Sequence, residues 1–377
     1  MKILHIIYTN GIGGAEKHLK YLLPGIKNQG IDCELLILCP PASLNILSKF
    51  AEEIKAEGVN STVISIKHNI SIKTLTVVKN FLLKNKFLIV HSHLLRTDLI
   101  VSMIKQFYIN SLFIISTKHG YQEKVLTNYT PLQPKIKKDL IYYVTKYTLS
   151  KINKNISVSK YISQLFMNLN LSKEIFPVIY HGVNVDNRFT EKDYNYKKSD
   201  IQLIIVGRLE KCKGHIYAFK AFKIITEKYP DAKLVIVGDG SMKDSLKMTR
   251  EELGLTEKIS FLGFQKNPSA FICQSDVIII PSHFESFGLV FIEAMALRVP
   301  IVAFDVPAGN EILTNGKTAL LSKKDDIELL AQNILTLLDN KEKNKYIANN
   351  AFKTFQENFT INIMIKNTVA FYNELHT

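Results

Sequence analysis

Residues 201–215 read IQLIIVGRLEKCKGH, and with this stretch the pattern of the second half of the chain begins. Its first six residues are almost all apolar, which is typical of a strand that a parallel sheet buries on both faces. A loop with two cations follows, Arg208 and Lys213, and Gly207 and Gly214 remove side-chain bulk beside them. Such a loop suits a diphosphate, because arginine offers a planar fork and lysine a compact charge. The alternative is a surface loop whose charges are solvated.

The same pattern, an apolar run followed by a helix-length amphipathic segment, recurs in both directions along the chain. The downstream runs are AKLVIVG, KISFLGF, DVIIIP and PIVAF, and the upstream runs are KILHIIY, CELLILC, TVISI, FLIVHSH, LFIISTKH and NISVS. Strands that alternate with helices predict a parallel sheet covered on both faces. Residues 184–200 are polar and lack apolar periodicity, so they predict a linker.

We therefore expect two Rossmann-like, doubly wound α/β domains that face each other across a cleft, with helices at the C-terminus. A chain of 377 residues has room for two substantial cores. The first domain should span residues 1–190 and the second residues 191–377, with the option that the last helix packs back on the first domain. Because ligands of such sheets bind beyond the carboxyl ends of the strands, the chemistry should lie just after each strand.

The composition excludes several classes of protein. Hydrophobic residues make up 46% of the chain, which is too many for a disordered protein. No apolar run approaches the roughly 18 residues of a membrane span, and the N-terminal KILHIIY predicts a first strand rather than a signal peptide. The four cysteines have neither metal-type nor redox-type spacing, which favours a reducing cytoplasm.

The net charge of +14 is concentrated in the first half of the chain. Residues 1–190 carry 24 lysines and arginines against 11 acids, leaving +13, whereas residues 191–377 carry 24 against 23, leaving +1. Within the first half, residues 135–155 (KIKKDLIYYVTKYTLSKINKN) mix lysines with large apolar side chains. This pattern predicts either docking on an anionic membrane or acidic acceptor, or a solvated helix with one core face. No recognition motif accompanies the charge, so nucleic acid is not expected as a partner.

Two glutamates eight positions apart lie in ESFGLVFIE, residues 285–293, directly after the predicted strand DVIIIP. If a helix begins near Gly288, Glu285 lies in the loop before it and Glu293 about two turns inside. The loop position lets Glu285 bend back toward the helix. Both carboxylates could then reach one polar ligand.

The first predicted strand is followed by TNGIGGAEKH, residues 9–18. Gly11, Gly13 and Gly14 allow close approach of the backbone, and the N–H groups of the helix behind them could hold phosphate oxygens. The stretch matches neither a dinucleotide fingerprint nor a nucleotide P-loop. It predicts either a phosphate cradle or a plain turn.

Four histidines fall at or near strand ends. His119 ends a predicted strand before Gly120, which favours a functional residue over a turn residue. His91 and His93 alternate along one strand, and we expect one of them to be a core histidine. His181 we expect to be structural. No metal site is predicted, because the sequence places no cysteine or third ligand beside the His91 and His93 pair.

Seven motifs, taken in order, resemble glycosyltransferase family 4. They are GGAE, STKHG, YHGVN, GRLEKCKG, VGDGS, FLGF and SHFESFGLVFIEAMA. The resemblance covers essentially the whole chain and is more specific in its second half. It implies the two-domain GT-B fold and a retaining enzyme that uses a nucleotide-sugar donor.

The resemblance implies a role for each matched position. Arg208 and Lys213 would bind the donor diphosphate and stabilise charge on the departing nucleotide. Glu285 would face the hydroxyls of the transferred sugar and Glu293 those of the ribose, while His119 would contact the sugar near the reacting carbon. The other expected donor contacts are Gly13, Gly14, Gly207, Gly263, Phe264, Phe287, Gly288 and Leu289.

Retention in this family is usually explained by front-face attack, in which the leaving phosphate helps to take the acceptor proton. The resemblance therefore implies neither a pair of catalytic carboxylates nor a metal or other cofactor. Two departures weaken assignments in the loop after PIVAF: Ala308 and Ala319 stand where relatives commonly have glycine.

The function we expect is hexosyl transfer from a UDP- or GDP-sugar to a glycan or lipid-linked glycan, in polysaccharide, lipopolysaccharide or glycolipid biosynthesis. The enzyme should be cytoplasmic, with peripheral attachment to the inner membrane face as an option. Two alternatives remain at this point. One is a nucleotide-sugar epimerase of the same architecture, and the other is a non-catalytic basic protein that binds membranes.

Overall fold

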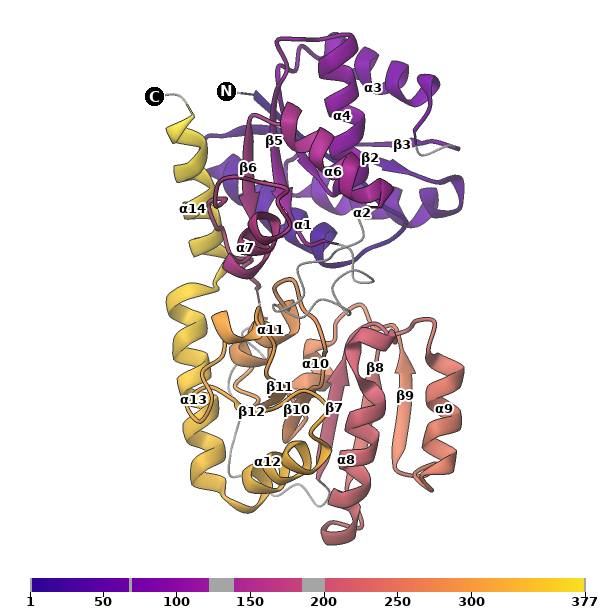
Figure 1. Ribbon diagram of the computed structural model, residues 1–377, viewed down its shortest axis with the longest axis vertical. Coiled ribbons are helices and arrows are strands. Elements are labelled where there is room, and N and C mark those ends of the chain that lie inside the picture. Colours follow the sequence, from indigo (N-terminus) through magenta and orange to yellow (C-terminus); the bar gives the residue numbers. More distant parts are fainter. Residues whose placement is uncertain (1, 68–69, 122–138, 185–200, 376–377) are drawn as a thin grey trace. The chain divides into compact units, whose positions relative to one another are not determined.

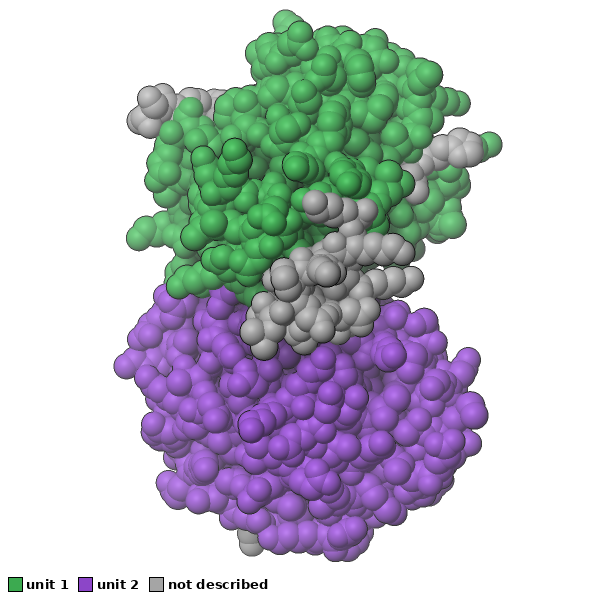
Figure 2. Space-filling model, in the orientation of Figure 1, with its two compact units in different colours: residues 1–182, 361–377 green, residues 183–360 purple. Residues whose placement is uncertain are grey.

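The computed structural model describes residues 2–67, 70–121, 139–184 and 201–375. By its internal contacts the chain divides into two compact units (Figure 2). The first unit comprises Met1–Gly182 with Ile361–Thr377, and the second comprises Val183–Thr360. Each unit contains one six-stranded sheet, and every strand pair in both sheets is parallel (Figure 1).

The first sheet has the strand order β3-β2-β1-β4-β5-β6. Its strands are β1 (Lys2–Tyr8), β2 (Asp32–Cys39), β3 (Ser61–Ser65), β4 (Ile89–His93), β5 (Phe113–Lys118) and β6 (Lys154–Ser157). The order reverses between β1 and β4, so the two loops that follow these strands diverge to opposite sides. The register pairs Ile7 with His93 and His93 with Thr117, so the carboxyl ends of β1, β4 and β5 lie side by side.

Helices cover both faces of the first sheet. They are α1 (Gly14–Asn28), α2 (Leu44–Ala56), α3 (Ile72–Lys84), α4 (Leu95–Phe107), α6 (Leu140–Lys151), α7 (Lys160–Asn168) and α14 (Ile361–Glu374). Because successive strand residues point to opposite faces, Ile3 and Ile7 of β1 pack with α1, α2 and α14. Leu4 and Ile6 of the same strand pack with α3 and α4.

The second sheet repeats this topology, with the order β12-β11-β10-β7-β8-β9. Its strands are β7 (Gln202–Val206), β8 (Lys233–Val237), β9 (Ile259–Gly263), β10 (Val277–Ile280), β11 (Ile301–Phe304) and β12 (Leu320–Ser322). Its helices are α8 (His215–Lys228), α9 (Lys243–Glu252), α10 (Ser269–Ile272), α11 (Leu289–Ala296), α12 (Ile327–Asp339) and α13 (Lys341–Asn358). The order reverses between β7 and β10. The predicted fold class, two doubly wound parallel-sheet domains, is confirmed.

The last helix belongs to the first unit. α14 packs against α1, and Gly25 allows the approach, because a Cβ at that position would lie 2.0 Å from Cδ1 of Ile365. Tyr372 of α14 is fully buried in the first core. The predicted boundary between residues 190 and 191 lies outside the described residues.

The basic segment at residues 135–155 is only partly described, since residues 135–138 lie outside the described ranges. In α6, Tyr142, Thr145 and Thr148 are buried, whereas Leu140 and Tyr143 are 78% and 57% exposed. The helix thus has one core face and an outer face that carries apolar side chains. Within the described ranges, every helix is too short or too polar to cross a bilayer.

Candidate functional site

Lys213 and Glu285 meet where the strand order of the second sheet reverses. Lys213 ends a short 3-10 turn (Lys211–Lys213) after β7, and Glu285 lies in the loop after β10. The Lys213 Nζ atom is 2.7 Å from Oε1 of Glu285, and the Glu285 side chain is only 8% exposed. Lys213 and Glu285, both predicted site residues, are 72 positions apart in the sequence and form one ion pair. The hydrogen bond is charge-assisted, which makes it stronger than a neutral one.

Backbone contacts hold these two loops together. Gly214 adopts the left-handed conformation with φ +66°, and a Cβ there would lie 1.9 Å from the carbonyl oxygen of Pro281, the residue after β10. Only glycine permits that approach. The N–H of His283 also donates to the carbonyl of Cys212 at 2.7 Å. Gly214, which lacks a side chain, therefore lets the loop of Lys213 pack directly beside the loop of Glu285.

Gly207 and Arg208 directly follow β7. Gly238 crosses so closely that a Cβ on it would lie 1.8 Å from the carbonyl oxygen of Gly207. The N–H of Leu209 donates to the carbonyl of Asp239 at 2.9 Å, which fixes the start of this loop. The Arg208 side chain is exposed. Arg208 and the loop that carries Lys213 both follow the carboxyl end of β7.

α11 begins where the sequence predicted, with Gly288 as its N-cap. Gly288 has φ +93°, and a Cβ there would lie 2.4 Å from the ring of Phe291. The Phe287 side chain is 3% exposed and packs edge-on against Phe359, so this ring is buried in the second unit. Leu289 opens the helix and Glu293, further along it, is half-buried.

Gly263 and Phe264 lie at the end of β9. Gly263 has φ +67°, and no atom lies within 4 Å of the position of its Cβ. The Phe264 ring is 63% exposed. The strand order puts β9 at one edge of the sheet, two strands from β7. These two residues are thus further from the ion pair in the sheet than the residues after β7 and β10.

In the first unit, Gly13 caps α1. Its N–H donates to Oε2 of Glu16 at 2.8 Å, and Glu16 is buried. Gly13 and Gly14 are both exposed at this helix start. A Cβ on Gly13 would come within 3.2 Å of the Glu16 carboxylate, so the turn favours glycine. One backbone donor of the predicted phosphate cradle is therefore already taken by a carboxylate of the chain.

His119 follows β5 and is hydrogen-bonded to His93, with 3.0 Å between Nε2 of His119 and Nδ1 of His93. The expectation that no third ligand lies beside His91 and His93 is wrong. His5 of β1 comes within 3.1 Å of His93, and ligand atoms of the three histidines lie within 4.8 Å of one another. Parallel pairing of β1 with β4 sets His5 beside His91. His5 and His93 are 88 residues apart, so no local pattern in the sequence indicates that they are neighbours.

Burial makes all these imidazoles weak bases. It lowers the pKa of His5 to about 3 and that of His18 to about 4. It also lowers the pKa well below the usual 6.5 at four other positions of the first unit: His91, His93, His119 and His181. Removing a cation from water is costly, so these rings are neutral near pH 7.

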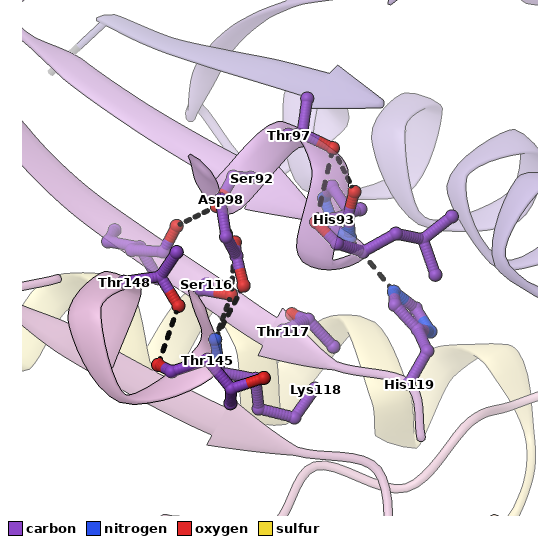
Figure 3. Close-up of polar contacts among 12 residues, drawn as sticks. Ser92, His93, Thr97, Asp98, Ser116, Thr117, Lys118, His119, Thr145 and Thr148 are labelled. Atoms are coloured by element: carbon purple, nitrogen blue, oxygen red, sulfur yellow. Dashed lines mark hydrogen bonds and ion pairs between the residues drawn. The ribbon is translucent and has the colours of Figure 1, made fainter. Parts of the chain in front are cut away.

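A buried ion pair beside the histidines was not found from the sequence. Lys118 Nζ lies 2.6 Å from Oδ2 of Asp98, and the two side chains are 5% and 2% exposed. Ser116 donates to Oδ1 of Asp98 at 2.7 Å, and Ser92 donates to the same oxygen (Figure 3). No spacing signal links an acid of α4 to the last residue of β5. Only the pairing of β4 with β5 brings the two together.

A pocket of about 280 Å³ opens at this end of the first sheet. Its polar lining comes from the ion pair and from side chains at the end of β5, and its apolar lining includes two aromatic rings. The lining includes Asp98, Thr117, Lys118, His119, Tyr121 and Phe166. An apolar wall with a few fixed polar groups is the usual form of a small-molecule site.

Two family models match the chain, each over a little less than half of it. Residues 12–187 match the model described as Glycosyltransferase Family 4, and residues 186–354 match the one described as Glycosyl transferases group 1. The two matches together span both sheets.

Several curated relatives are named as glycosyltransferases. An uncharacterized glycosyltransferase of Methanocaldococcus jannaschii is 32% identical over 251 residues, covering 64% of this chain and 60% of the relative. The N-acetylgalactosamine-N,N'-diacetylbacillosaminyl-diphospho-undecaprenol 4-alpha-N-acetylgalactosaminyltransferase of Campylobacter jejuni is 25% identical over 356 residues, covering 92% of each. This chain matches about three fifths of the length of two M. jannaschii relatives, 60% and 61%.

Solved structures share the fold. Anabaena HepE in complex with UDP-glucose has a TM-score of 0.80 at 18% identity, covering 99% of each chain. A glycosyltransferase of Rickettsia africae has a TM-score of 0.78 at 20% identity, covering 100% of this chain and 98% of its own. At such low identity the likeness concerns the fold alone.

Proposed function

We propose that this chain, whose two halves match glycosyltransferase family models, is a glycosyltransferase of the GT-B fold that moves a hexosyl unit from a nucleotide-diphosphate sugar to a glycan or lipid-linked glycan. We propose further that the transfer retains the anomeric configuration and needs no metal ion. The observation that carries the proposal is the ion pair of Lys213 with Glu285, at the point where the strand order of the second sheet reverses.

The Lys213 ammonium supplies charge at the donor diphosphate. It has three N–H donors, of which Glu285 accepts one at 2.7 Å. In the complex, the other donors bind phosphate oxygens, and the Arg208 guanidinium adds a planar fork. These two cations stabilise the negative charge that grows on the leaving nucleotide, which is work that a divalent ion does in other transferases. The pairing supports this role because it preorganises the ammonium in a partly buried position.

The two glutamates bind opposite ends of one donor. Glu285, nearly buried beside Lys213, accepts hydrogen bonds from hydroxyls of the transferred sugar, and Glu293 on α11 accepts them from the ribose. Backbone N–H groups at the start of α11, at Gly288 and Leu289, face the sugar and phosphate. Phe264 lies beside the base. The glycine at position 288 supports this assignment because it adds no side chain of its own at the start of the helix.

The first unit supplies the acceptor side and the reacting-carbon contact. Gly13 and Gly14 approach the phosphates and acceptor, and His119 contacts the transferred sugar. The leaving phosphate takes the acceptor proton in a front-face mechanism, so no second catalytic carboxylate is assigned. The basic excess of +13 in residues 1–190 supports an anionic lipid surface or an acidic glycan as the partner of this unit. Peripheral attachment at the inner face of a membrane is part of the same proposal.

Incubation of the purified chain with a panel of UDP- and GDP-sugars tests the reaction class. Release of free UDP or GDP supports transfer, with water acting as a slow acceptor when no glycan is present. A new sugar-nucleotide isomer would instead indicate an epimerase, and binding without turnover would indicate a non-catalytic protein. A thermal-shift series with nucleotides alone names the base, because a bound ligand raises the melting temperature by mass action.

A further inference from the structure

A single file of hydrogen bonds crosses the core of the first unit. It begins at Thr117, whose Oγ1 lies 2.7 Å from Nε2 of His91. The other ring nitrogen of His91, Nδ1, lies 2.5 Å from the hydroxyl of Tyr372, and that hydroxyl lies 3.2 Å from Nε2 of His5. Strands β1, β4 and β5 and helix α14 each contribute to this first stretch.

The file continues to the end of β5. Nδ1 of His5 lies 3.1 Å from Nε2 of His93, and Nδ1 of His93 lies 3.0 Å from Nε2 of His119. Nδ1 of His119 ends the file, because it is covered and has no hydrogen-bond partner among the described residues. We call this series of six side chains the histidine chain: Thr117, His91, Tyr372, His5, His93 and His119.

When the Tyr372 hydroxyl donates to one of its two histidine partners, the order of donors along the histidine chain takes one of two forms. Each neutral imidazole has one nitrogen that donates and one that accepts, and here the two nitrogens of His91, His5 and His93 each have one partner. If His119 donates from Nε2, every bond points toward Thr117 and Nδ1 of His119 is an acceptor. If Thr117 donates, every bond points the other way and Nδ1 of His119 carries the proton.

The two residues at the ends of the histidine chain both line the same pocket. Thr117 and His119 are two residues apart at the end of β5, and both line the 280 Å³ pocket described above. The interior members are buried, with His5, His91, His93 and Tyr372 at most 1% exposed. Solvent therefore has no direct access to the middle of the chain, and exchange of protons occurs at its ends.

Ligand atoms of His5, His91 and His93 lie within 4.8 Å of one another, but each nitrogen of these rings already has a hydrogen-bond partner. His91 and His93 stack with centroids 4.6 Å apart and planes 15° apart, and His5 and His93 stack with centroids 5.4 Å apart and planes 17° apart. The nitrogens of these rings already serve the hydrogen bonds of the chain.

We propose that the histidine chain is an uncharged proton relay that sets which nitrogen of His119 carries the proton, with His93 as the positioning residue. A ligand hydroxyl in the pocket can give its proton to Nδ1 of His119. The Nε2 proton of His119 then passes to His93 and each following proton moves one bond along, so that Thr117 receives a proton from His91 and gives its own hydroxyl proton to a water molecule or a second ligand oxygen in the pocket. Atoms and charge balance, and no imidazolium forms in the core.

The relay lets His119 either accept a hydrogen bond from its ligand or donate one to it. With Nδ1 as acceptor, His119 binds a donor hydroxyl, and with the bonds reversed it donates to a ligand oxygen. A saccharide hydroxyl can play either part, which fits a substrate that is rich in hydroxyls. This inference rests on the proposed function only in its kinetic test, since the tautomers can be measured without any reaction.

Nitrogen-15 NMR of the histidines in the full chain tests the relay directly. Neutral tautomers are distinguished by which ring nitrogen is protonated. We expect His5, His91, His93 and His119 to be neutral at pH 7 and to point the same way. Tyr372→Phe breaks the file between His91 and His5 and should change the tautomer balance of His119. The control is Thr368→Val, because the Thr368 hydroxyl is buried on the same helix but bonds only to the carbonyl of Met364.

Two substitutions of His93 separate positioning from packing. Asparagine keeps a polar atom at the position of Nδ1, next to His119, whereas glutamine keeps one at the position of Nε2, next to His5. We expect His93→Gln to lower kcat about tenfold with little change in the donor KM, and His93→Asn to recover most of that loss, since acid–base positioning contributes factors of this order or more. A purely structural role would affect both variants alike.

Three results would overturn the relay. They are a charged imidazole in the histidine chain at pH 7, His119 tautomers unchanged by both Tyr372→Phe and His93→Gln, and a stoichiometric metal ion in the purified protein. If His93→Gln does not fold, Tyr372→Phe decides the question, since phenylalanine fills the same core site. If the wild type releases no nucleotide from any donor, the proposed function fails while the NMR result still decides the relay.

Discussion

The hydroxyl of Tyr372 lies 3.2 Å from Nε2 of His5, although 367 residues separate the two in the chain. The last helix of the protein therefore completes the core around its first strand. Met364 and Phe371 of α14 are buried in the same core cluster as Ile3 and Ile7. The first unit thus depends on a segment made after the whole second unit.

Met364→Ala should destabilise the first unit by about 2–5 kcal/mol, the usual cost of removing a buried large side chain. Met364 is 1% exposed, whereas Lys366 two positions on is exposed, so Lys366→Ala is the control and should change stability by less than about 0.5 kcal/mol. Chemical denaturation measures the difference. Equal effects of the two substitutions would contradict the packing described for α14.

Acid should unfold the first unit before the second. Burial lowers the pKa of His5 to about 3 and of His18 to about 4, whereas both titrate near 6.5 when unfolded. Below pH 6.5 the unfolded chain thus binds protons that the folded chain refuses. Stability is complete above pH 6.5 and falls as pH falls, by up to about 1.4 kcal/mol per pH unit for each such histidine, until the folded pKa is reached.

Hydrogen exchange resolved by segment measures this acid effect. Strands β1, β4 and β5 should lose protection between pH 6.5 and about 4, ahead of β8 and β10. Four further histidines of the first unit add to the effect in the same direction: His91, His93, His119 and His181. The second unit has fewer such groups, chiefly His215, whose pKa burial lowers to about 4. Unchanged stability from pH 7 to 5 would contradict neutral burial of the cluster.

Gly214→Ala should disturb the Lys213 loop. The new Cβ would meet the Pro281 carbonyl oxygen at 1.9 Å, and a left-handed φ already costs a non-glycine residue about 1–2 kcal/mol. Gly316→Ala is the matched control, because Gly316 also has a positive φ, +75°, but has open space at its Cβ. We expect the control to show the conformational cost alone, with nucleotide release intact. Loss of release in both variants, or in neither, would show that the close approach at Pro281 does not matter.

The sequence predicts some elements of this structure and misses others. Apolar runs such as IQLIIV and KILHIIY predicted β7 and β1, because strands buried in parallel sheets need such runs. The three-residue β12 was not predicted, since Leu320–Ser322 is too short to stand out from its surroundings. The return of α14 to the first unit was left as an option. α14 packs on the first unit because Ile365 fits closely over Gly25, and no local pattern in the sequence predicts this contact.

The site residues likewise fall into those that local sequence patterns predict and those that they miss. Local chemistry selected Arg208, Lys213 and Glu285, and the structure brings the last two into contact. The residues that were missed act through long-range pairing. His5 joins His93 across neighbouring strands, and Asp98 of α4 meets Lys118 only because β4 lies beside β5. Periodicity reveals elements, but it does not reveal which side chains their packing brings together.

Liposome sedimentation tests the membrane part of the proposal. Binding to anionic vesicles should weaken steeply as salt rises, because the Debye length falls from about 10 Å at 0.1 M to about 3 Å at 1 M. A double variant, Leu140→Ser with Tyr143→Ser, should reduce binding, since both side chains are exposed on α6. Ile175→Ser, at a position 63% exposed elsewhere in the first unit, is the control. Sedimentation that does not depend on anionic lipid would end this idea.

Nucleotide release by lysine variants measures what Lys213 contributes at the donor diphosphate. Lys213→Ala should lower the rate of UDP or GDP release by a factor on the order of 100, which corresponds to about 2–4 kcal/mol of lost transition-state stabilisation. Lys211→Ala, in the same loop at an exposed position, should release nucleotide at the wild-type rate. Wild-type release by Lys213→Ala, with the protein folded, would contradict the assignment of this lysine to the donor diphosphate.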